Sequence, residues 1–114
     1  MRPVTDPVAM ARVRWLVPNR HPAPGSTIGA TAVFVLGNDA EVMPGWPATG
    51  QHLSILLTFT DSLSATDEAE AKIDFLNRDA VADYLRENAS FLVMAGPQPI
   101  AEGRITSVLW KPRG

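Results

Sequence analysis

Apolar and polar residues alternate along several segments of the chain, as they do in β-strands with one buried and one exposed face. The clearest case is residues 11–17, where the apolar side chains share one face while Arg12 and Arg14 lie on the other. The same alternation over residues 53–60 and 69–76 predicts two further strands. The inward-facing residues expected from these patterns are Ala11, Val13, Trp15, Val17, Leu53, Ile55, Leu57, Phe59, Ala71, Ile73 and Phe75.

Residues 91–109 have the pattern of a closing β-hairpin, with two short apolar strands joined by a turn. Gly96 lies in that turn, next to a proline. Gly103 is expected at the head of the last strand, where a bulge or a close approach of the backbone favours glycine. Residues 31–36 predict one more strand, which a turn at residues 37–39 closes.

One short helix is predicted before this hairpin. Asn77 can cap its N-terminus, and Asp79 suits the positive end of the helix dipole. The residues expected on its apolar face are Val81, Tyr84 and Leu85. Asn88 can adopt a positive φ and so end the helix after roughly two to three turns.

Six strands and one helix too short to form a layer of its own predict an all-β fold. We expect a six-stranded antiparallel β-barrel of the Greek-key type, with the short helix before the closing hairpin. Residues 1–9 are expected to form an N-terminal extension and residues 10–111 the barrel. A chain of 114 residues is expected to fold as one domain.

The composition is that of an ordinary soluble protein, with 46% hydrophobic and 19% charged residues. No apolar run in the sequence approaches the ~20 residues that cross a bilayer. The first residues contain prolines and Asp6 where a signal peptide needs an apolar stretch. The sequence has no cysteine, which excludes disulfides and thiolate zinc sites. We therefore expect a cytoplasmic protein without membrane contacts.

Charge is segregated along the chain, although the net charge is only −2. Residues 1–36 carry a net charge of +3, residues 37–103 carry −8, and the rest of the chain carries +3. If the first and last strands lie side by side, Arg12, Arg14 and Arg104 share one basic outer face. Such a face could contact a charged partner, although outward arginines on an exposed sheet are the simpler interpretation.

Four segments resemble, in the same order, parts of the C-terminal barrel (domain III) of translation elongation factor Tu. They are an opening strand at residues 11–16, a proline-glycine turn at 42–45, an apolar strand at 71–76 and the hairpin at 91–109. The hairpin aligns without a gap and brings five residues onto matching positions: Phe91, Gly96, Ile100, Gly103 and Leu109. The resemblance implies the same barrel fold, as a free-standing domain, and a translation-related role.

Two features of that family are missing from this sequence. Residues 26–34 contain neither the tyrosine nor the arginine of the family's Gly-Tyr-Arg-Pro-aromatic motif, so strong binding of aminoacyl-tRNA is not expected. The chain also lacks a Gly-x4-Gly-Lys-Ser/Thr loop, so we expect no nucleotide binding and no GTPase activity.

No pattern in the sequence is typical of a catalytic or metal site. His21 and His52 lie 31 residues apart, without the spacing of metal ligands. Asp67, Glu68 and Glu70 form a small acidic cluster, but neighbours along a strand point to opposite faces, which favours a solvated edge. The sequence offers no nucleophile elbow and no cysteine nucleophile. We therefore expect no enzyme activity, no cofactor and no metal.

Trp46 lies in a loop rich in proline and glycine, residues 43–50. It is equally suited to anchor a partner and to close one end of the barrel. Together these features favour a non-enzymatic binding module with four candidate contact residues: Arg12, Arg14, Trp46 and Arg104. A protein partner is expected, and RNA is the less favoured partner. The alternatives are an antitoxin- or immunity-type small protein and a small enzyme with a site at the barrel mouth.

Overall fold

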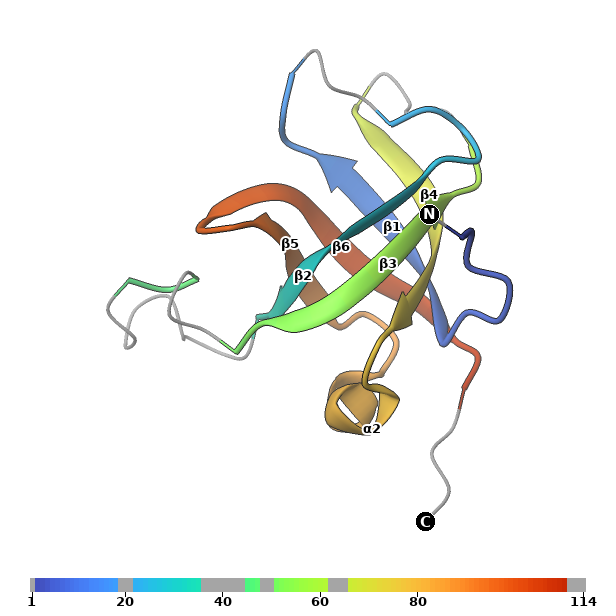
Figure 1. Cartoon of the computed structure of the whole chain (residues 1–114), viewed down its shortest axis with the longest axis vertical. Coiled ribbons are helices and arrows are strands. Elements are labelled where there is room, and N and C mark those ends of the chain that lie inside the picture. Colours follow the sequence, from blue (N-terminus) through green and yellow to red (C-terminus); the bar gives the residue numbers. More distant parts are fainter. Residues whose placement is uncertain (1, 19–21, 36–44, 48–50, 62–65, 111–114) are drawn as a thin grey trace.

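The structure, a computed structural model, describes residues 2–18, 22–35, 45–47, 51–61 and 66–110. Six strands form a closed barrel (Figure 1): β1 (Ala9–Trp15), β2 (Thr27–Phe34), β3 (Leu53–Phe59), β4 (Glu68–Phe75), β5 (Ser90–Ala95) and β6 (Gln98–Val108). Their order around the barrel is β1-β4-β3-β2-β5-β6, and every neighbouring pair is antiparallel. Because β2, β3 and β4 are consecutive neighbours while β1 lies beside β4 and β5 beside β2, the topology is a Greek key. The predicted all-β barrel is confirmed.

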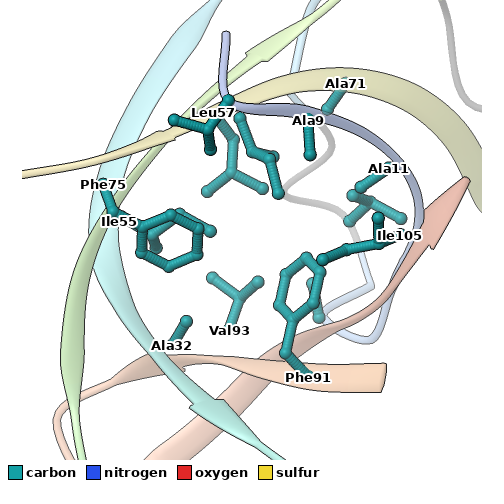
Figure 2. Close-up of a cluster of buried hydrophobic side chains, with 14 of the residues drawn as sticks. Ala9, Ala11, Ala32, Ile55, Leu57, Ala71, Phe75, Phe91, Val93 and Ile105 are labelled. Atoms are coloured by element: carbon teal, nitrogen blue, oxygen red, sulfur yellow. The ribbon is translucent and has the colours of Figure 1, made fainter. Parts of the chain in front are cut away.

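Apolar side chains from all six strands fill the interior of the barrel (Figure 2). Large and small residues face each other across the strand pairs, since Phe59 is the Cα partner of Ala71. The ring of Phe34 packs against two other rings. Its centroid lies 5.5 Å from that of Phe91 and 6.0 Å from that of Phe75. The predicted inward faces of β1, β3 and β4 are confirmed for most of their residues, because all of them within these strands except Trp15 and Leu53 are buried. Trp15 and Leu53 are half-buried and pack against the core, and Val17 lies beyond β1.

Gly103 does not lie at the head of the last strand, as the sequence suggested, but in the middle of β6. The strand begins earlier because the hairpin turn is tight: Gly96 has a φ of +60°, and pairing resumes at Gln98. The expected close approach is present at Gly103 nevertheless. A Cβ at this position would overlap the ring of Phe91, its Cα partner on β5.

Two other strand boundaries also differ from the predictions. β1 ends at Trp15 rather than at Val17, and β2 begins at Thr27 rather than at residue 31. Gly29 and Ala30 gave no β-branched signal, yet both pair with β3. Leu36, the expected end of that strand, lies outside the described residues, as do His21, the turn at 37–39 and most of the loop at 43–50.

The residues before β1 pack against the barrel, and Val8 belongs to its hydrophobic core. Val4 and Val8 are buried, and the backbone N–H of Val4 donates a hydrogen bond of 2.8 Å to Oγ1 of Thr58. The hydroxyl groups of Thr58 and Thr27 are hydrogen-bonded to each other, also at 2.8 Å. Thr58 is the one buried polar residue among the described residues, and its hydroxyl ties the N-terminal segment to β2 and β3.

The predicted short helix consists of α2 (Arg78–Val81), which gives way to a 3₁₀ turn, η1 (Ala82–Tyr84). The capping prediction is confirmed, because the N–H of Ala80 donates to Oδ1 of Asn77 at 3.1 Å. Asn88 has the expected positive φ, 69°. Leu85 is already extended, which ends the helical segment after two short turns.

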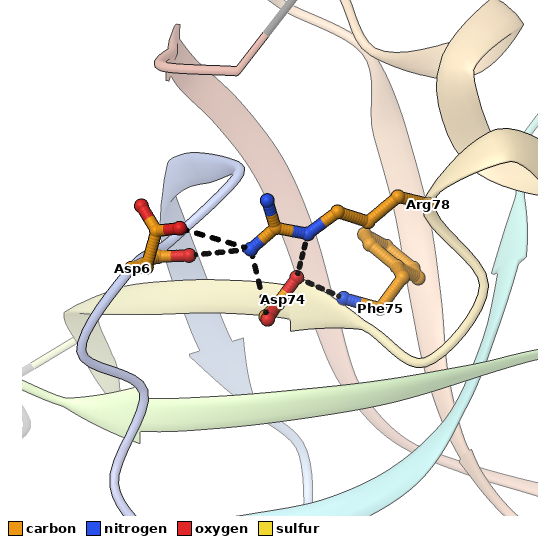
Figure 3. A network of polar contacts seen from close by, with 4 residues as sticks. All are labelled: Asp6, Asp74, Phe75 and Arg78. Atoms are coloured by element: carbon orange, nitrogen blue, oxygen red, sulfur yellow. Dashed lines mark hydrogen bonds and ion pairs between the residues drawn. The ribbon is translucent and has the colours of Figure 1, made fainter. Parts of the chain in front are cut away.

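Arg78 fastens the N-terminal segment to β4 and the helix (Figure 3). Its guanidinium donates to both carboxylate oxygens of Asp74, at 3.1 and 3.2 Å, and to the carbonyl of Asp6 at 2.8 Å. It also lies 5.7 Å from the ring centroid of Trp110, which is half-buried two residues beyond β6. The hydrogen bonds to Asp74, with the charges of Asp74 and Asp6, raise the pKa of Arg78.

Candidate functional site

Arg12 and Arg104 lie opposite each other on the outside of the barrel. β1 and β6 are antiparallel neighbours, and their register makes these two residues Cα partners. Their side chains point outward, because the residues on either side of them in each strand are buried. Arg14 lies two residues further along β1 on the same side. We call the surface formed by Arg12, Arg14 and Arg104 the arginine face.

The segregation of charge along the sequence suggested a basic face. The arginine face instead contains acidic residues as well. Two rows of outward residues cross β4, β1, β6 and β5, one being Glu70, Arg12, Arg104 and Ser90, the other Glu68, Arg14, Glu102 and Leu92. Arg14 therefore has acidic Cα partners on both sides, and Arg12 has one. The acidic segment of the sequence supplies these residues because β4 and β6 both lie beside β1.

All residues of the two rows except Glu70 line an open concavity of about 390 Å³ on the barrel surface. Its charged and hydroxyl lining residues are Arg12, Arg14, Glu68, Ser90, Glu102 and Arg104, with Val35 and Leu92 as its apolar edge. The opposed pair Arg12 and Arg104 lies with the hydroxyl-bearing Ser90 on one side and Glu70 on the other. The concavity can therefore offer several N–H donors and one O–H donor to an oxyanion.

None of the three guanidinium groups of the arginine face forms a hydrogen bond or ion pair with any residue that the structure describes. Arg14 and Arg104 are exposed and Arg12 is half-buried. Arg78, by contrast, is bound to two aspartates. Arg78 therefore stabilises the fold, whereas the three arginines of the arginine face have N–H donors available to a ligand.

Trp46, the fourth candidate, is half-buried in a turn between β2 and β3 and does not line the concavity. The structure therefore groups the three arginines but does not bring Trp46 to them. Ser90, Val35 and Leu92 line the concavity without having been singled out from the sequence. Their contribution depends on the register of β5 against β6 and β2, which the alternation of one strand cannot reveal.

The other candidates form no catalytic or metal-binding arrangement among the described residues, and no group of three metal-binding side chains is found there. Nδ1 of His52 is hydrogen-bonded to the hydroxyl of Thr31 at 3.1 Å. In the acidic cluster, the backbone N–H of Glu70 donates to Asp61, and the hydroxyl of Thr60 donates to the Glu70 carboxylate at 3.3 Å. These contacts are typical of a polar strand edge.

No family model, no curated protein and no solved structure matches this chain. Among the described helices, none is long and apolar enough to cross a membrane.

Proposed function

We propose that the protein is a non-enzymatic binding module that holds an acidic group of a partner protein on the arginine face. The observation that carries the proposal is the direct opposition of Arg12 and Arg104 across β1 and β6. Like charges at opposed positions destabilise a sheet. An oxyanion bound between the two guanidinium groups relieves this repulsion through charge-assisted hydrogen bonds.

The acidic residues around the arginines favour a protein partner over RNA. Glu70, Glu68 and Glu102 are Cα partners of the arginines, so a chain of closely spaced phosphates that crosses the opposed pair would also meet carboxylates. The lining of the concavity offers no exposed ring for bases to stack on, since Phe91 is buried. A single carboxylate can reach Arg12 and Arg104 without meeting either obstacle.

The packing of the barrel also supports a binding role. Phe34, Phe59 and Phe91 are buried and fill the space in which a barrel enzyme would hold its substrate. The Greek-key barrel agrees with the fold implied by the resemblance to the C-terminal barrel of elongation factor Tu. A relationship to that family, a translation-related role and a cytoplasmic location are part of the same proposal.

The proposal is tested by comparing partner capture between three tagged proteins in nuclease-treated lysate of the native cells. They are the wild type, the Arg12→Gln/Arg104→Gln double variant, and an Arg2→Gln/Lys72→Gln control that removes two cations outside the concavity. We expect at least one protein to be retained by the wild type and the control and lost from the double variant. Identical capture by all three proteins, or turnover of a small molecule by the pure protein, would contradict the proposal.

A further inference from the structure

The concavity at the arginine face continues into a second concavity at each end. Towards β4 it shares Arg14 and Glu68 with a concavity of about 380 Å³ that Thr66 and Asp67 also line. Towards η1 it shares Val35 and Ser90 with another of about 520 Å³. The further residues of that end are Phe34, Asp83, Tyr84, Arg86 and Ala89. We call the continuous depression the cross-strand groove.

The length of the groove matches a short extended peptide. Neighbouring strands are spaced by about 4.8 Å, so the path over β4, β1, β6 and β5 covers about 14 Å. An extended chain advances by about 3.3 Å per residue, which gives about four residues over the strands and roughly six to eight with both ends included.

The chemistry of the groove changes along its length. Its centre holds the opposed pair Arg12 and Arg104, whereas the β4 end holds two carboxylates, Asp67 and Glu68, against the single cation Arg14. Acidic side chains of a ligand are therefore favoured at the centre and disfavoured at the β4 end. This pattern fits a peptide with one acidic residue at a defined position and does not fit a polyanion.

The η1 end of the groove has an apolar part that is held in place, beside the charged residues Asp83 and Arg86. The ring of Tyr84 stacks on Phe34 with a centroid distance of 5.0 Å and an interplanar angle of 14°. Its hydroxyl donates to Oε1 of Gln51 at 3.1 Å, which fixes the ring from the far side. Val35 is 40% exposed beside it. A fixed aromatic ring with an exposed aliphatic neighbour is a suitable seat for an apolar side chain, because little ordering is needed on binding.

We propose that the cross-strand groove binds an extended segment of a partner protein, with an acidic side chain between Arg12 and Arg104 and an apolar side chain over Val35 and Tyr84. The inference rests on the proposed function of the arginine face. Val35 lies beyond Ser90, about 10 Å from Arg104 by strand spacing, so the acidic and apolar residues are about two to four positions apart in the peptide.

The test is a selection from a displayed library of random peptides on the immobilised wild-type protein. The peptides have about 12 residues, so that they exceed the length of the groove. Selected peptides are then synthesised with a fluorescent label, and their Kd values are measured by polarisation. The variants are Arg12→Gln/Arg104→Gln, Val35→Asn for the apolar end, and the Arg2→Gln/Lys72→Gln control. Thermal unfolding of each variant verifies that it is folded.

We expect the selected peptides to share an Asp or Glu with an apolar residue two to four positions away. Their Kd should rise at least about tenfold in the arginine double variant, which corresponds to ~1.4 kcal/mol. It should rise measurably in Val35→Asn and stay unchanged in the control.

Three results would overturn the inference. In the first, the peptides need the arginines for binding but lack the acidic-apolar spacing, or their Kd is the same for Val35→Asn as for the wild type. The groove assignment then fails, while the arginine face remains a binding surface. If the peptides bind the double variant as well as the wild type, both the groove and the proposed function fail. If a single-stranded RNA oligonucleotide displaces a selected peptide at 150 mM salt, the groove takes a nucleic acid and the protein-ligand assignment is wrong.

Discussion

The ring of Phe91 lies against the backbone of Gly103, its Cα partner across β5 and β6, in the space that a Cβ at position 103 would occupy. Both residues face the interior, and Phe91 also contacts Phe34. Phe91 can lie between two strands of the barrel only because glycine stands opposite it.

Gly103→Ala should therefore destabilise the protein by about 1–3 kcal/mol, because the ring of Phe91 has to move in a closely packed core. Urea unfolding measures the change. A Phe91→Leu background should remove much of the penalty of Gly103→Ala, since the smaller side chain leaves space for the new methyl group. Full additivity of the two substitutions would show that the ring does not determine the need for glycine.

Thr58→Val tests the attachment of the N-terminal segment. The substitution keeps the shape of the side chain but leaves the N–H of Val4 and the hydroxyl of Thr27 without their partner. We expect a loss of about 1–3 kcal/mol in the free energy of unfolding. Thr106→Val, at an exposed position of β6, is the control and should change stability little. Equal stability of both variants would mean that Thr58 does not hold the segment.

Removal of two arginines from the same face should have opposite effects on stability. Arg104→Gln removes a like charge opposite Arg12, so stability should stay the same or rise by a few tenths of a kcal/mol. Arg14→Gln removes the cation between Glu68 and Glu102 and should lower stability slightly. Denaturant titrations at low salt measure both, and a clear loss of stability in Arg104→Gln would indicate that this residue serves the fold.

Transfer RNA should bind weakly, with a Kd of about 10 μM or weaker at ~150 mM salt. The net charge is −2, and Glu68, Glu70 and Glu102 stand beside the arginines. Polarisation with labelled tRNA over a range of salt concentrations measures the affinity. A submicromolar complex with a steep salt dependence would instead indicate a translation factor that binds RNA directly.

The sequence predicted the fold well because a period of two in polarity determines which residues are buried. Val13, Leu57 and Ile73 were assigned to the interior from alternation alone and are fully buried. Alternation does not determine strand order or register, however. The acidic partners of Arg12 and Arg14 come from β4 and β6, both of which are distant from β1 along the chain.

The same limit applies to single residues at the site. Ser90 carries no signal in the sequence and becomes part of the concavity only because it is the Cα partner of Arg104. Gly103 was recognised as a place of close approach, but the residue that approaches, Phe91, depends on the pairing of β5 with β6. Trp46 was singled out for its residue type, and its position proved to be away from the arginines.

Binding of an acidic ligand between Arg12 and Arg104 can be observed at the two side chains themselves. The most direct measurement is an NMR titration that follows the arginine Nε–Hε and backbone amide signals of the wild-type protein while a selected acidic peptide is added. We expect saturable shifts at Arg12 and Arg104 and at the amides of Ser90 and Val35, with little change at Arg78. Saturable binding that leaves the signals of Arg12 and Arg104 unchanged would contradict it.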